Sequence, residues 1–349
     1  MPVSEFRPSV SILIAARNEA PTILACLQAI DQLDYPADLV EVLIGNDQST
    51  DQTADRVTHF IADKPRFRLY TIDQSVAGLA GKANVLAQLA RHATGDLLFF
   101  TDADTQVPTT WLLHMSQAFA GTVGVVTGIT LPGITLPGIT LPGATLPIGP
   151  AIFHKLQGID WLYNLTLVNL LSNLNIPVTA MGNNMAVSRA AYEAVGGYES
   201  LPFSVVEDYT LFQAITKQGF GFRSLLNEQV LASTKAVDTL LVFLQQRKRW
   251  MRGATALPGW MVVPLYLQYL LLPLFLLLGW LAPGLAITLY LARFAGQTCI
   301  ILHGLRCVRK TKLWPYALLF EIYQLLIGPL AVAYYLLPIP IQWKGRRFA

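Results

Sequence analysis

The segment DLLFFTDADT, Asp96 to Thr105, joins an apolar run of strand length to two acidic side chains. A short apolar run of this kind is typical of a strand that is buried on both faces of a sheet. Asp102 and Asp104 follow at positions i and i+2, so their side chains share one side of an extended chain. Two carboxylates in that arrangement suit a hard divalent cation that also binds phosphate oxygens, although Asp is also common in solvated turns. The segment predicts a buried strand that ends at a metal site or at an acidic turn.

Apolar runs of the same kind precede this segment and alternate with helix-like stretches. The runs cover Val10–Ala16, Val40–Asp47 and Arg68–Ile72, and the helix-like stretches cover 20–32, 50–61 and 82–92. Alternation of strands and helices predicts an α/β fold with a mostly parallel sheet that is covered on both faces. In such sheets ligands bind beyond the carboxyl ends of the strands. Asp47, Asp102 and Asp104 follow strand ends, so we expect them to face a common binding crevice.

The composition is too apolar for an ordinary soluble domain. Of the 349 residues, 53% are hydrophobic and only 13% are charged, whereas about 25% are charged in a typical soluble domain. Residues 253–292 contain no acidic or basic side chain, and residues 313–337 contain only Glu321. A membrane-spanning helix needs about 20 apolar residues. We therefore expect a cytoplasmic domain over 1–252 and a membrane domain over 253–349. A net charge of +3 is too small to indicate a nucleic-acid partner.

Three hydrophobic segments are predicted in the membrane domain, over 260–281, 285–305 and 313–337. Basic clusters at 247–252 and 306–312 flank the first two, and the positive-inside rule places both clusters on the cytoplasmic side. This pattern predicts a multi-pass protein of the cytoplasmic (inner) membrane, with its N-terminal domain in the cytoplasm. Arg293 falls inside the second segment, where it is costly unless it faces protein, water or lipid phosphate.

For the third hydrophobic segment, the positive-inside rule and the number of membrane crossings give opposite locations for the tail that follows. A full span would export the basic tail 343–349, which the rule opposes. The alternative is a re-entrant or interfacial segment in which Glu321 and the Gly328–Pro329 step mark a bend. We favour three helices and leave the side of the tail open.

A series of short motifs follows in order along residues 10–253. They are ILIAARNEA (12–20), NDQSTDQT (46–53), GKANVLAQL (81–89), TDAD (101–104), GNNMAVSRAAYEAVGGY (182–198), VVEDYTLFQAITKQGF (205–220) and QQRKRW (245–250). The series resembles the membrane-bound, inverting family 2 glycosyltransferases of A-type fold, with their DDGSTD, GKAxALN, DxD, ED and QxxRW motifs. Asn46 and Gln48 depart from the DDGS pattern, but Asp47, at the position of the usual base-contacting acid, is retained.

The resemblance implies a role for each matching residue. Nucleotide-sugar binding is implied for Ala16, Arg17, Glu19, Asp47, Lys82, Asp102, Gln246 and Arg249. Asp104 and Asp102 would hold Mg²⁺ or Mn²⁺. The acceptor side would be lined by Gly182, Asn183, Asn184 and Trp250. Asp208 would be the catalytic base, with Glu207 beside it as an orienting or ligand-binding acid.

These residue types fit the chemistry that the family performs. Departure of a nucleoside diphosphate develops negative charge, which a metal ion and the planar fork of Arg249 can stabilise. The acceptor hydroxyl must lose a proton as it attacks, and the carboxylate of Asp208 can accept that proton. One direct displacement inverts the anomeric centre, so an α-linked donor gives a β-glycoside.

Several of these assignments have a structural alternative. Glu207 and Asp208 could simply open the helix that follows them, where acids favour the positive end of the helix dipole. Trp250 could anchor the chain at the edge of the bilayer. A solvated face or a contact with anionic lipids could explain the basic residues Arg247, Lys248 and Arg252.

The sequence GITLPGITLPGITLPGATLP, residues 128–147, repeats one pentapeptide four times, with Ala144 in place of Ile. Pro at every fifth position excludes a helix and a central strand, so we expect extended units that turn at Pro-Gly. The repeat carries no group suited to acid–base, metal or phosphate chemistry. We interpret it as a loop inserted between the catalytic core and the acceptor side. A lid and a contact with the membrane surface are the alternatives.

Together these features predict transfer of a sugar from a nucleotide sugar, expected to be a UDP-sugar, to a membrane-lipid or isoprenoid acceptor. The membrane domain is small for a polysaccharide channel, which favours the lipid acceptor over a processive polysaccharide synthase. The hypothesis from another class is a non-catalytic nucleotide-sugar sensor or scaffold. We would expect such a protein to lack an essential side chain of the site, and Asp47, Asp104, Asp208 and Arg249 are all present.

Overall fold

The computed structural model describes residues 7–76, 78–134, 148–254, 259, 262–263, 267, 270–343 and 346–348. These residues form two compact units. The first unit contains the described residues within 1–144 and 167–235, and the second contains those within 145–166 and 236–349. The division falls within one long helix, α5 (Ile148–Asn173). The boundary between a cytoplasmic domain and a membrane domain at residue 252 stays a prediction.

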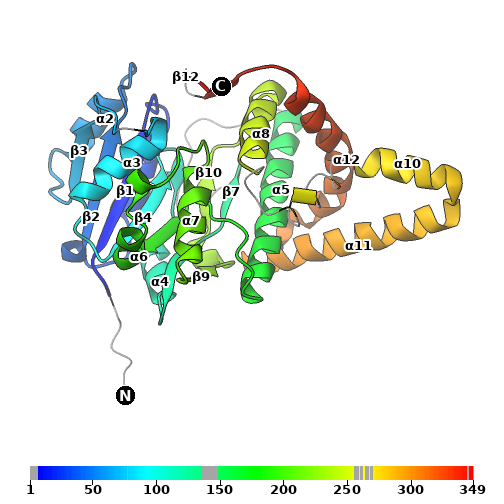
Figure 1. Cartoon of the computed structure of the whole chain (residues 1–349), viewed down its shortest axis with the longest axis horizontal. Helices are drawn as coiled ribbons and strands as arrows, with labels where there is room; N and C mark the ends of the chain where they lie inside the picture. Colours follow the sequence, from blue (N-terminus) through cyan, green and yellow to red (C-terminus); the bar gives the residue numbers. More distant parts are fainter. Residues whose placement is uncertain are drawn as a thin grey trace. The chain divides into compact units, whose positions relative to one another are not determined.

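A seven-stranded sheet organises the first unit, with the strand order β3-β2-β1-β4-β8-β6-β9 (Figure 1). Its strands are β1 (Val10–Ala16), β2 (Val40–Asn46), β3 (Phe67–Thr71), β4 (Leu97–Asp102), β6 (Val123–Thr127), β8 (Met185–Ser188) and β9 (Gly221–Ser224). β1 pairs in parallel with β2 and β4, β2 with β3, and β6 with β9. β8 alone runs antiparallel to its neighbours, β4 and β6. The predicted α/β fold with a mostly parallel sheet is confirmed.

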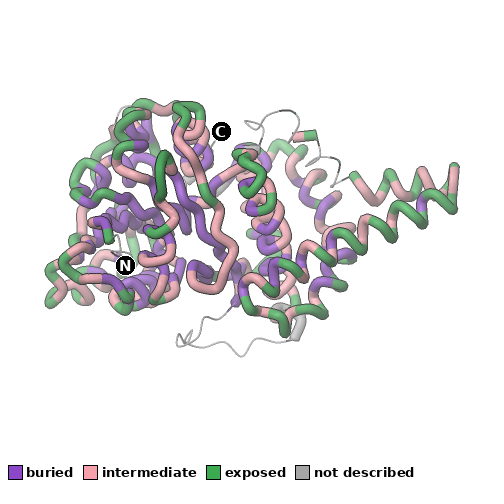
Figure 2. Tube along the Cα trace, turned by 90° about the horizontal axis from the view of Figure 1, so that it is seen from below, coloured by how far each residue is buried: buried purple, intermediate pink, exposed green. Residues whose placement is uncertain are grey.

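Helices cover both faces of this sheet because its central strands are apolar on both sides. Successive residues of β1 point to opposite faces, and Ile12, Leu13 and Ile14 are all fully buried. Ile12 and Ile14 pack with one set of helices, α1 (Ile23–Asp31), α2 (Thr53–Ile61) and α4 (Trp111–Gln117). Leu13 packs with the other set, α3 (Gly81–His92), α6 (Arg189–Ala194) and α7 (Glu207–Lys217). The buried strands run through the middle of this unit in Figure 2.

A second sheet of the first unit incorporates the start of the pentapeptide repeat. Its strand order is β5-β10-β7, formed by β5 (Thr105–Gln106), β10 (Ala232–Thr234) and β7 (Thr130–Pro132). Leu131 is fully buried, Ile134 is 5% exposed, and the Gly133 N–H donates to the carbonyl of Thr234. The expectation of an inserted loop is therefore wrong for residues 128–134, which pack into the core. Pro132 is accommodated because β7 is an edge strand. Residues 135–147 lie outside the described residues.

The second unit is mainly helical. It contains the first part of α5, α8 (Leu240–Ala254), α10 (Leu271–Leu281), α11 (Pro283–Cys307), α12 (Trp314–Leu336) and a hairpin of β11 (Ile341–Trp343) and β12 (Arg346–Phe348). Two segments among the described residues are long and apolar enough to cross a membrane, Pro283–Cys307 and Thr311–Leu336. They agree with the predicted segments 285–305 and 313–337. Much of the first half of segment 260–281 lies outside the described residues, and α10 covers only 11 residues of it.

The third hydrophobic segment forms one uninterrupted helix. α12 continues for 23 residues with Pro329 in its interior, so the helix is not interrupted at the Gly328–Pro329 step that one alternative marked as a bend. Glu321, expected at that bend, accepts a hydrogen bond of 2.5 Å from Arg293 of α11. The unfavourable position of Arg293 in an apolar segment is therefore compensated by a protein partner.

Candidate functional site

Neighbouring parallel strands present the predicted donor-side residues at their carboxyl ends. Beyond β1 and β2, the Arg17 Nη1 atom donates to the carbonyl of Asp47 (2.6 Å), and the Asp47 N–H donates to the carbonyl of Ala16 (2.8 Å). β4 pairs with β1 and ends at Asp102. The strand ends thus place Ala16, Arg17, Asp47 and Asp102 along one edge of the sheet, and their role in binding a nucleotide sugar stays a prediction.

Glu19 lies beyond β1 as well, and its contacts order the backbone of that loop. Its Oε2 atom accepts a hydrogen bond from Thr22 Oγ1 (2.6 Å), and its N–H donates to Thr53 Oγ1 (2.7 Å). Glu19 is 7% exposed. These contacts give Glu19 a clear structural role, while the nucleotide contact predicted for it stays a prediction.

Lys82 lies between carboxylates that come from distant parts of the chain. Its Nζ atom is 2.6 Å from Asp102 Oδ1 at the end of β4 and 3.1 Å from Glu207 Oε1 in the first turn of α7. The side chains of Lys82 and Glu207 are only 13% and 11% exposed. A buried ammonium group needs such partners because burial alone disfavours its charged form. One cation thus joins the DxD and ED segments.

The pKa values of two acids respond to this crowding. Burial, together with the neighbouring charge of Asp102, raises the pKa of Asp104 to about 6, against the opposing effect of Lys82. Burial and the charge of Glu207 likewise raise the pKa of Asp208 to about 6. Burial lowers the pKa of Lys82, but the charges of Asp102, Glu207 and Asp208 outweigh it, so the Lys82 pKa lies above its usual value. The cluster therefore combines a fully charged Lys82 with acids that titrate near neutral pH.

Gly182 fixes the position of the Asp208 carboxylate. The Gly182 N–H donates to Asp208 Oδ2 at 2.6 Å, and the Tyr209 N–H donates to Asp208 Oδ1 at 2.8 Å. A Cβ atom at position 182 would lie 2.8 Å from the Asp208 Cβ atom, closer than real Cβ contacts allow. Glu207 and Asp208 do open α7, as the structural alternative proposed. They also belong to the carboxylate cluster, so the two interpretations are compatible.

Asn184 links three segments of the core. Its side-chain amide donates to the carbonyls of Ile129 and Val230, both at 2.9 Å, and its Oδ1 atom accepts a hydrogen bond from Trp111 Nε1 at 2.8 Å. It is fully buried, and both of its amide hydrogens are used. These contacts give Asn184 a structural role in the core, and the acceptor-side role predicted for it stays a prediction.

The side chain of Asn183, unlike that of Asn184, has a buried oxygen without a hydrogen-bond partner among the described residues. Asn183 is 6% exposed. Its carbonyl accepts a hydrogen bond of 3.1 Å from Thr101 Oγ1, one residue before Asp102. The acceptor-side roles predicted for Asn183 and Gly182 stay predictions.

The QxxRW residues belong to the second unit, whereas the carboxylate cluster belongs to the first. Gln246, Arg249 and Trp250 lie on α8. The Trp250 ring packs edge-on against Trp161 of α5, with centroids 5.2 Å apart. Their predicted roles at the donor and acceptor stay predictions.

Two basic residues of α8 are structural, contrary to the alternative of a solvated or lipid-facing surface. Arg247 forms an ion pair with Asp160 of α5, and its guanidinium carbon lies 4.6 Å from the centroid of the Trp250 ring. Lys248 is 7% exposed and donates to the carbonyl of Leu337 at 2.5 Å, just after α12. Its ammonium therefore satisfies a backbone carbonyl at that helix end.

Thr234 is a member of the site that no sequence signal indicated. Thr234 is the last residue of β10. Its side chain forms a hydrogen bond with Asp104, which favours the charged form of that acid. Thr234 pairs with Thr105, the residue after Asp104, across the small sheet. A contact between segments so distant in sequence can be seen only once the strands are paired.

Asp102 and Asp104 are the residues best suited to hold a metal ion. Among the described residues no group of three or more His, Cys, Asp or Glu side chains is arranged to do so. Two carboxylates leave coordination positions for phosphate oxygens and water, as Mg²⁺ usually requires at phosphate sites. The donor set therefore fits a cation that is bound together with a diphosphate.

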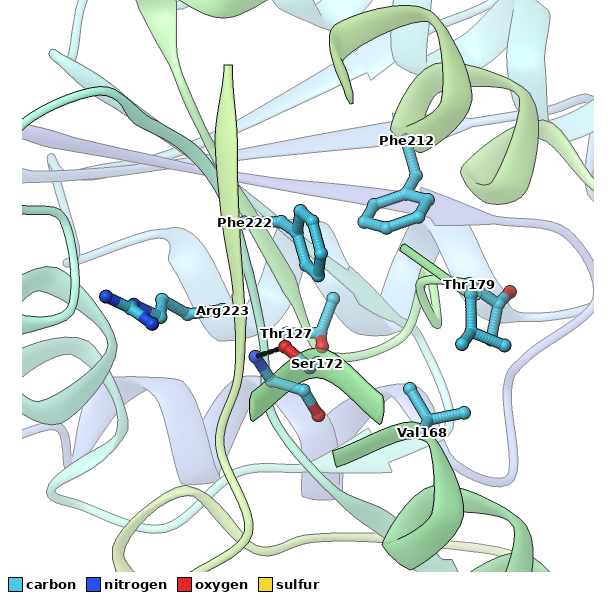
Figure 3. Close-up of a pocket in the computed structure, with 9 residues that line it drawn as sticks. Thr127, Val168, Ser172, Thr179, Phe212, Phe222 and Arg223 are labelled. Atoms are coloured by element: carbon cyan, nitrogen blue, oxygen red, sulfur yellow. Dashed lines mark hydrogen bonds between the residues drawn. The ribbon is translucent and has the colours of Figure 1, made fainter. Parts of the chain in front are cut away.

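A small pocket of the first unit lies elsewhere, between α5, α7 and β9 (Figure 3). Phe212, Phe222 and Val168 supply its apolar walls, and the Ser224 N–H donates to Ser172 Oγ at 3.2 Å. It has room for no more than about one water molecule. None of the predicted site residues lines it, so it is a packing defect beside the sheet.

Comparisons with known proteins find similar glycosyltransferases. The beta-monoglucosyldiacylglycerol synthase of Synechocystis sp. is 26% identical over 247 residues, 70% of this chain and 48% of that protein. The probable glycosyltransferase YdaM of Bacillus subtilis is 27% identical over 249 residues, 70% of this chain and 55% of that protein. The chain thus spans about half the length of the curated relatives it matches.

A solved structure shares the fold. The mannosyltransferase PcManGT from Pyrobaculum calidifontis, in complex with GDP-Man and Mn²⁺, is 20% identical with a TM-score of 0.53, covering 92% of this chain and 88% of that one. The model of "Glycosyl transferase family 2" matches residues 11–158, and that of "Glycosyl transferase family group 2" matches residues 97–337, more than half of the chain. The chain therefore belongs to family 2 of the glycosyltransferases.

Proposed function

We propose that this protein transfers a sugar from a nucleotide sugar to a lipid acceptor at the cytoplasmic face of a membrane, with inversion at the anomeric carbon. The observation that carries the proposal is the cluster of Lys82 with Asp102 and Glu207, at 2.6 and 3.1 Å, with Asp104 and Asp208 beside these two acids in the chain. Acids arranged on both sides of one cation can serve a donor phosphate and an acceptor hydroxyl at the same time.

On the donor side, the residues at the ends of β1, β2 and β4 would hold the nucleotide. Asp47 would contact the base, as the family resemblance implies, with Arg17 fixing its position through the backbone contact of 2.6 Å. Asp102 and Asp104 would hold Mg²⁺ or Mn²⁺ together with the diphosphate. When bound, the ion would neutralise the negative charge that develops on the leaving group.

Cationic side chains would share the task of stabilising the leaving diphosphate. Lys82 is already placed beside Asp102, so a diphosphate held at that carboxylate through a metal ion would lie within its reach. Arg249 can offer two parallel donors to phosphate oxygens, with Gln246 one turn earlier on α8. A UDP-sugar is the donor that the sequence analysis favours.

On the acceptor side, Asp208 would take the proton of the attacking hydroxyl. Its pKa of about 6 makes it ionised yet basic at neutral pH, which is what a general base requires. The Gly182 and Tyr209 N–H groups hold its two oxygens in place. Attack from the face opposite the leaving diphosphate inverts the anomeric carbon, so an α-linked donor gives a β-glycoside.

A lipid acceptor is supported by two independent observations. The relative from Synechocystis sp. is named for a monoglucosyldiacylglycerol with a β linkage. The described residues also contain two helices of membrane-spanning length and composition. These helices would hold the catalytic unit at the cytoplasmic membrane, where such a lipid resides, and Trp250 would stack against the acceptor. A processive polysaccharide synthase and a nucleotide-sugar sensor are the alternatives, and the product of the first experiment separates them.

The proposal predicts release of nucleoside diphosphate by the detergent-solubilised full chain, with Mn²⁺ or Mg²⁺ and a panel of UDP-, GDP- and dTDP-sugars. We expect release from a UDP-sugar only when extracted membrane lipid is added, with one labelled glycolipid as product. Labelled polymer of increasing length would instead identify a polysaccharide synthase. Nucleotide binding without release from any donor, with or without lipid, would favour the sensor.

Substitution Asp208→Asn should remove the base, while its one amide oxygen can still accept one of the two backbone hydrogen bonds, from Gly182 or from Tyr209. We expect donor affinity to stay within about twofold and turnover to fall by about 10²–10⁴. Isothermal titration with UDP measures the first quantity, and initial rates of diphosphate release measure the second. Turnover like that of the wild type would exclude Asp208 as the base.

The pH dependence of kcat/KM should report the same carboxyl group. Because the base must be deprotonated, the rate should rise with pH through a midpoint at about 6, the pKa of Asp208. The charge of Glu207 helps to raise that pKa, so Glu207→Gln should move the midpoint to lower pH. A midpoint that moves upward, or a profile that is flat from pH 5 to 8, would contradict the assignment.

Lys82 should stabilise the fold through its acidic neighbours. Lys82→Gln leaves Glu207 and Asp102 without their cation, and we expect a loss of about 2–3 kcal/mol, below the cost for a fully buried pair because the Asp102 side chain is 37% exposed. Lys82 lowers the pKa values of Asp104 and Asp208, so without it these acids resist ionisation more strongly. The destabilisation should therefore grow from pH 5 to pH 8.

The control is Lys82→Arg, which keeps the positive charge. Melting temperatures from tryptophan fluorescence, measured in detergent without nucleotide, should rank wild type above Lys82→Arg and Lys82→Arg above Lys82→Gln. Equal melting temperatures of wild type and Lys82→Gln at pH 8 would show that the cluster does not depend on this cation.

A further inference from the structure

α12 has a face that is covered by protein along much of its length, and the helices that cover it are α8 and the first part of α5, which belong to the same unit. The Phe320 ring packs against Tyr163 of α5, with centroids 5.7 Å apart. The Tyr323 ring lies edge-on to Phe243 of α8, with centroids 6.3 Å apart. α12 is therefore a neighbour of α5 and α8 in its first half.

The second half of α12 is held to α8 by polar groups. Gln245 Nε2 donates to the Tyr334 hydroxyl at 2.6 Å, and Lys248 Nζ donates to the carbonyl of Leu337 at 2.5 Å. Beyond the helix end, β11 also packs on α8, and Ile341 is 2% exposed. The C-terminal end of α12 and strand β11 therefore lie beside α8.

α8 itself is not a membrane-spanning helix. Its 15 residues are fewer than the about 20 that a span needs, and they include the four basic side chains Arg247, Lys248, Arg249 and Arg252. The residues 236–239, which join the first unit to α8, reach at most about 14 Å when extended, about half of the thickness of the hydrocarbon core. α8 therefore follows residue 235 too closely along the chain to be separated from it by the membrane, and α12 packs against α8.

The opposite face of α12 is an exposed apolar stripe that recurs with helical spacing. Its members include Leu318, Ile322, Leu326, Leu330 and Leu336, which are 40–74% exposed. The covered face packs against the aromatic rings of Tyr163 and Phe243 and against polar groups of α8, which leaves the apolar stripe for contact with lipid, as in a helix that lies along the membrane surface. The partner that fits this exposed apolar face is therefore the acyl region of a lipid bilayer.

The apolar hairpin of α10 and α11 leaves this group of helices at a large angle (Figure 1). α10 packs along α11, where the Phe275 and Tyr290 rings lie edge to face at 5.5 Å. Trp280 is 81% exposed and Ile287 is 61% exposed, and Figure 2 shows the hairpin exposed along much of its length. Such a surface must be covered by lipid.

Arg293 marks the level at which the hairpin joins α12. Its guanidinium donates to Glu321 at 2.5 Å and to Gln324 at 2.7 Å, both on α12. The 11 residues from Pro283 to Arg293 measure about 16 Å along the helix. This reach is about half of a hydrocarbon core of about 30 Å. The turn at Ala282–Pro283 would therefore end inside the bilayer.

We infer that α12 lies along the cytoplasmic surface of the membrane and that, among the described residues, only the α10–α11 hairpin enters the hydrocarbon, from one side. This inference rests on the membrane attachment in the proposed function and replaces the predicted multi-pass arrangement. It places the basic cluster at 306–312 and the basic tail at 343–349 on the same side, which removes the conflict between charge and the number of crossings.

The test is cysteine labelling with a membrane-impermeant maleimide in intact spheroplasts and in inverted membrane vesicles. The background is Cys299→Ser with Cys307→Ser, and Cys26 is retained because it is fully buried. Single cysteines replace Lys312 and Arg347 on the two sides of α12, and Gly284 at the turn of the hairpin. Gly284 has open space around a Cβ atom, so it tolerates the change. Lys217→Cys, exposed on α7 of the catalytic unit, is the reference for the cytoplasmic side.

We expect the cysteines at 217, 312 and 347 to react in inverted vesicles and to be protected in spheroplasts. The cysteine at 284 should react in neither until detergent is added. Reaction of position 347 from the side opposite to 312 would show that α12 crosses the membrane, and reaction of position 284 in spheroplasts would show a hairpin that crosses completely. Either result overturns the inference. Reaction of 217, 312 and 347 together in spheroplasts would instead contradict the cytoplasmic location in the proposed function and leave the placement of α12 supported.

Discussion

The Lys82 ammonium, held between Asp102 and Glu207, is the interaction on which the candidate site depends. The two acids lie at the end of β4 and at the start of α7, and like charges brought so close in a poorly hydrated place would repel without a cation. Lys82 comes from the first turn of α3, so three elements converge on one charge. The pKa values of Asp104 and Asp208, near 6, are raised by burial and by a neighbouring acid, so the positive charge of Lys82 only partly offsets these effects. A diphosphate and its metal ion would enter a site already organised around one positive charge.

The sheet and the strand-end acids could be predicted because their signals are local. An apolar run followed by acids places Asp102 at a strand end whatever the rest of the chain does. Asn184 could not be understood in this way, since its partners Trp111, Ile129 and Val230 are scattered along the chain. The same holds for Thr234, which meets Asp104 only through strand pairing. The repeat as a whole was interpreted as a loop because Pro recurs at every fifth position. Its first unit nevertheless forms the edge strand Thr130–Pro132, where Pro is tolerated.

The C-terminal helices show why composition alone does not settle how a helix meets a membrane. A spanning helix and an interfacial helix both present apolar residues to lipid, and hydropathy averages over all faces. In the arrangement that we infer, the contacts of α12 with α5 and α8 distinguish the two kinds of helix. α8 has only 15 residues, fewer than the about 20 that a spanning helix needs, and it carries four basic side chains. Lys248 and Arg247 looked like surface charges in the sequence because consecutive basic residues usually are, yet each has a partner within the second unit.

The uncharged turn between α10 and α11 also bears on how the chain reaches its membrane during synthesis. No acidic or basic side chain occurs from Gly253 to Ala292. A hairpin that stops inside the bilayer would require no hydrophilic loop to be carried to the far side. Its insertion would then need neither a translocation channel nor a membrane potential, and could follow release of the finished polypeptide from the ribosome. The catalytic unit could fold in the cytoplasm first and dock afterwards.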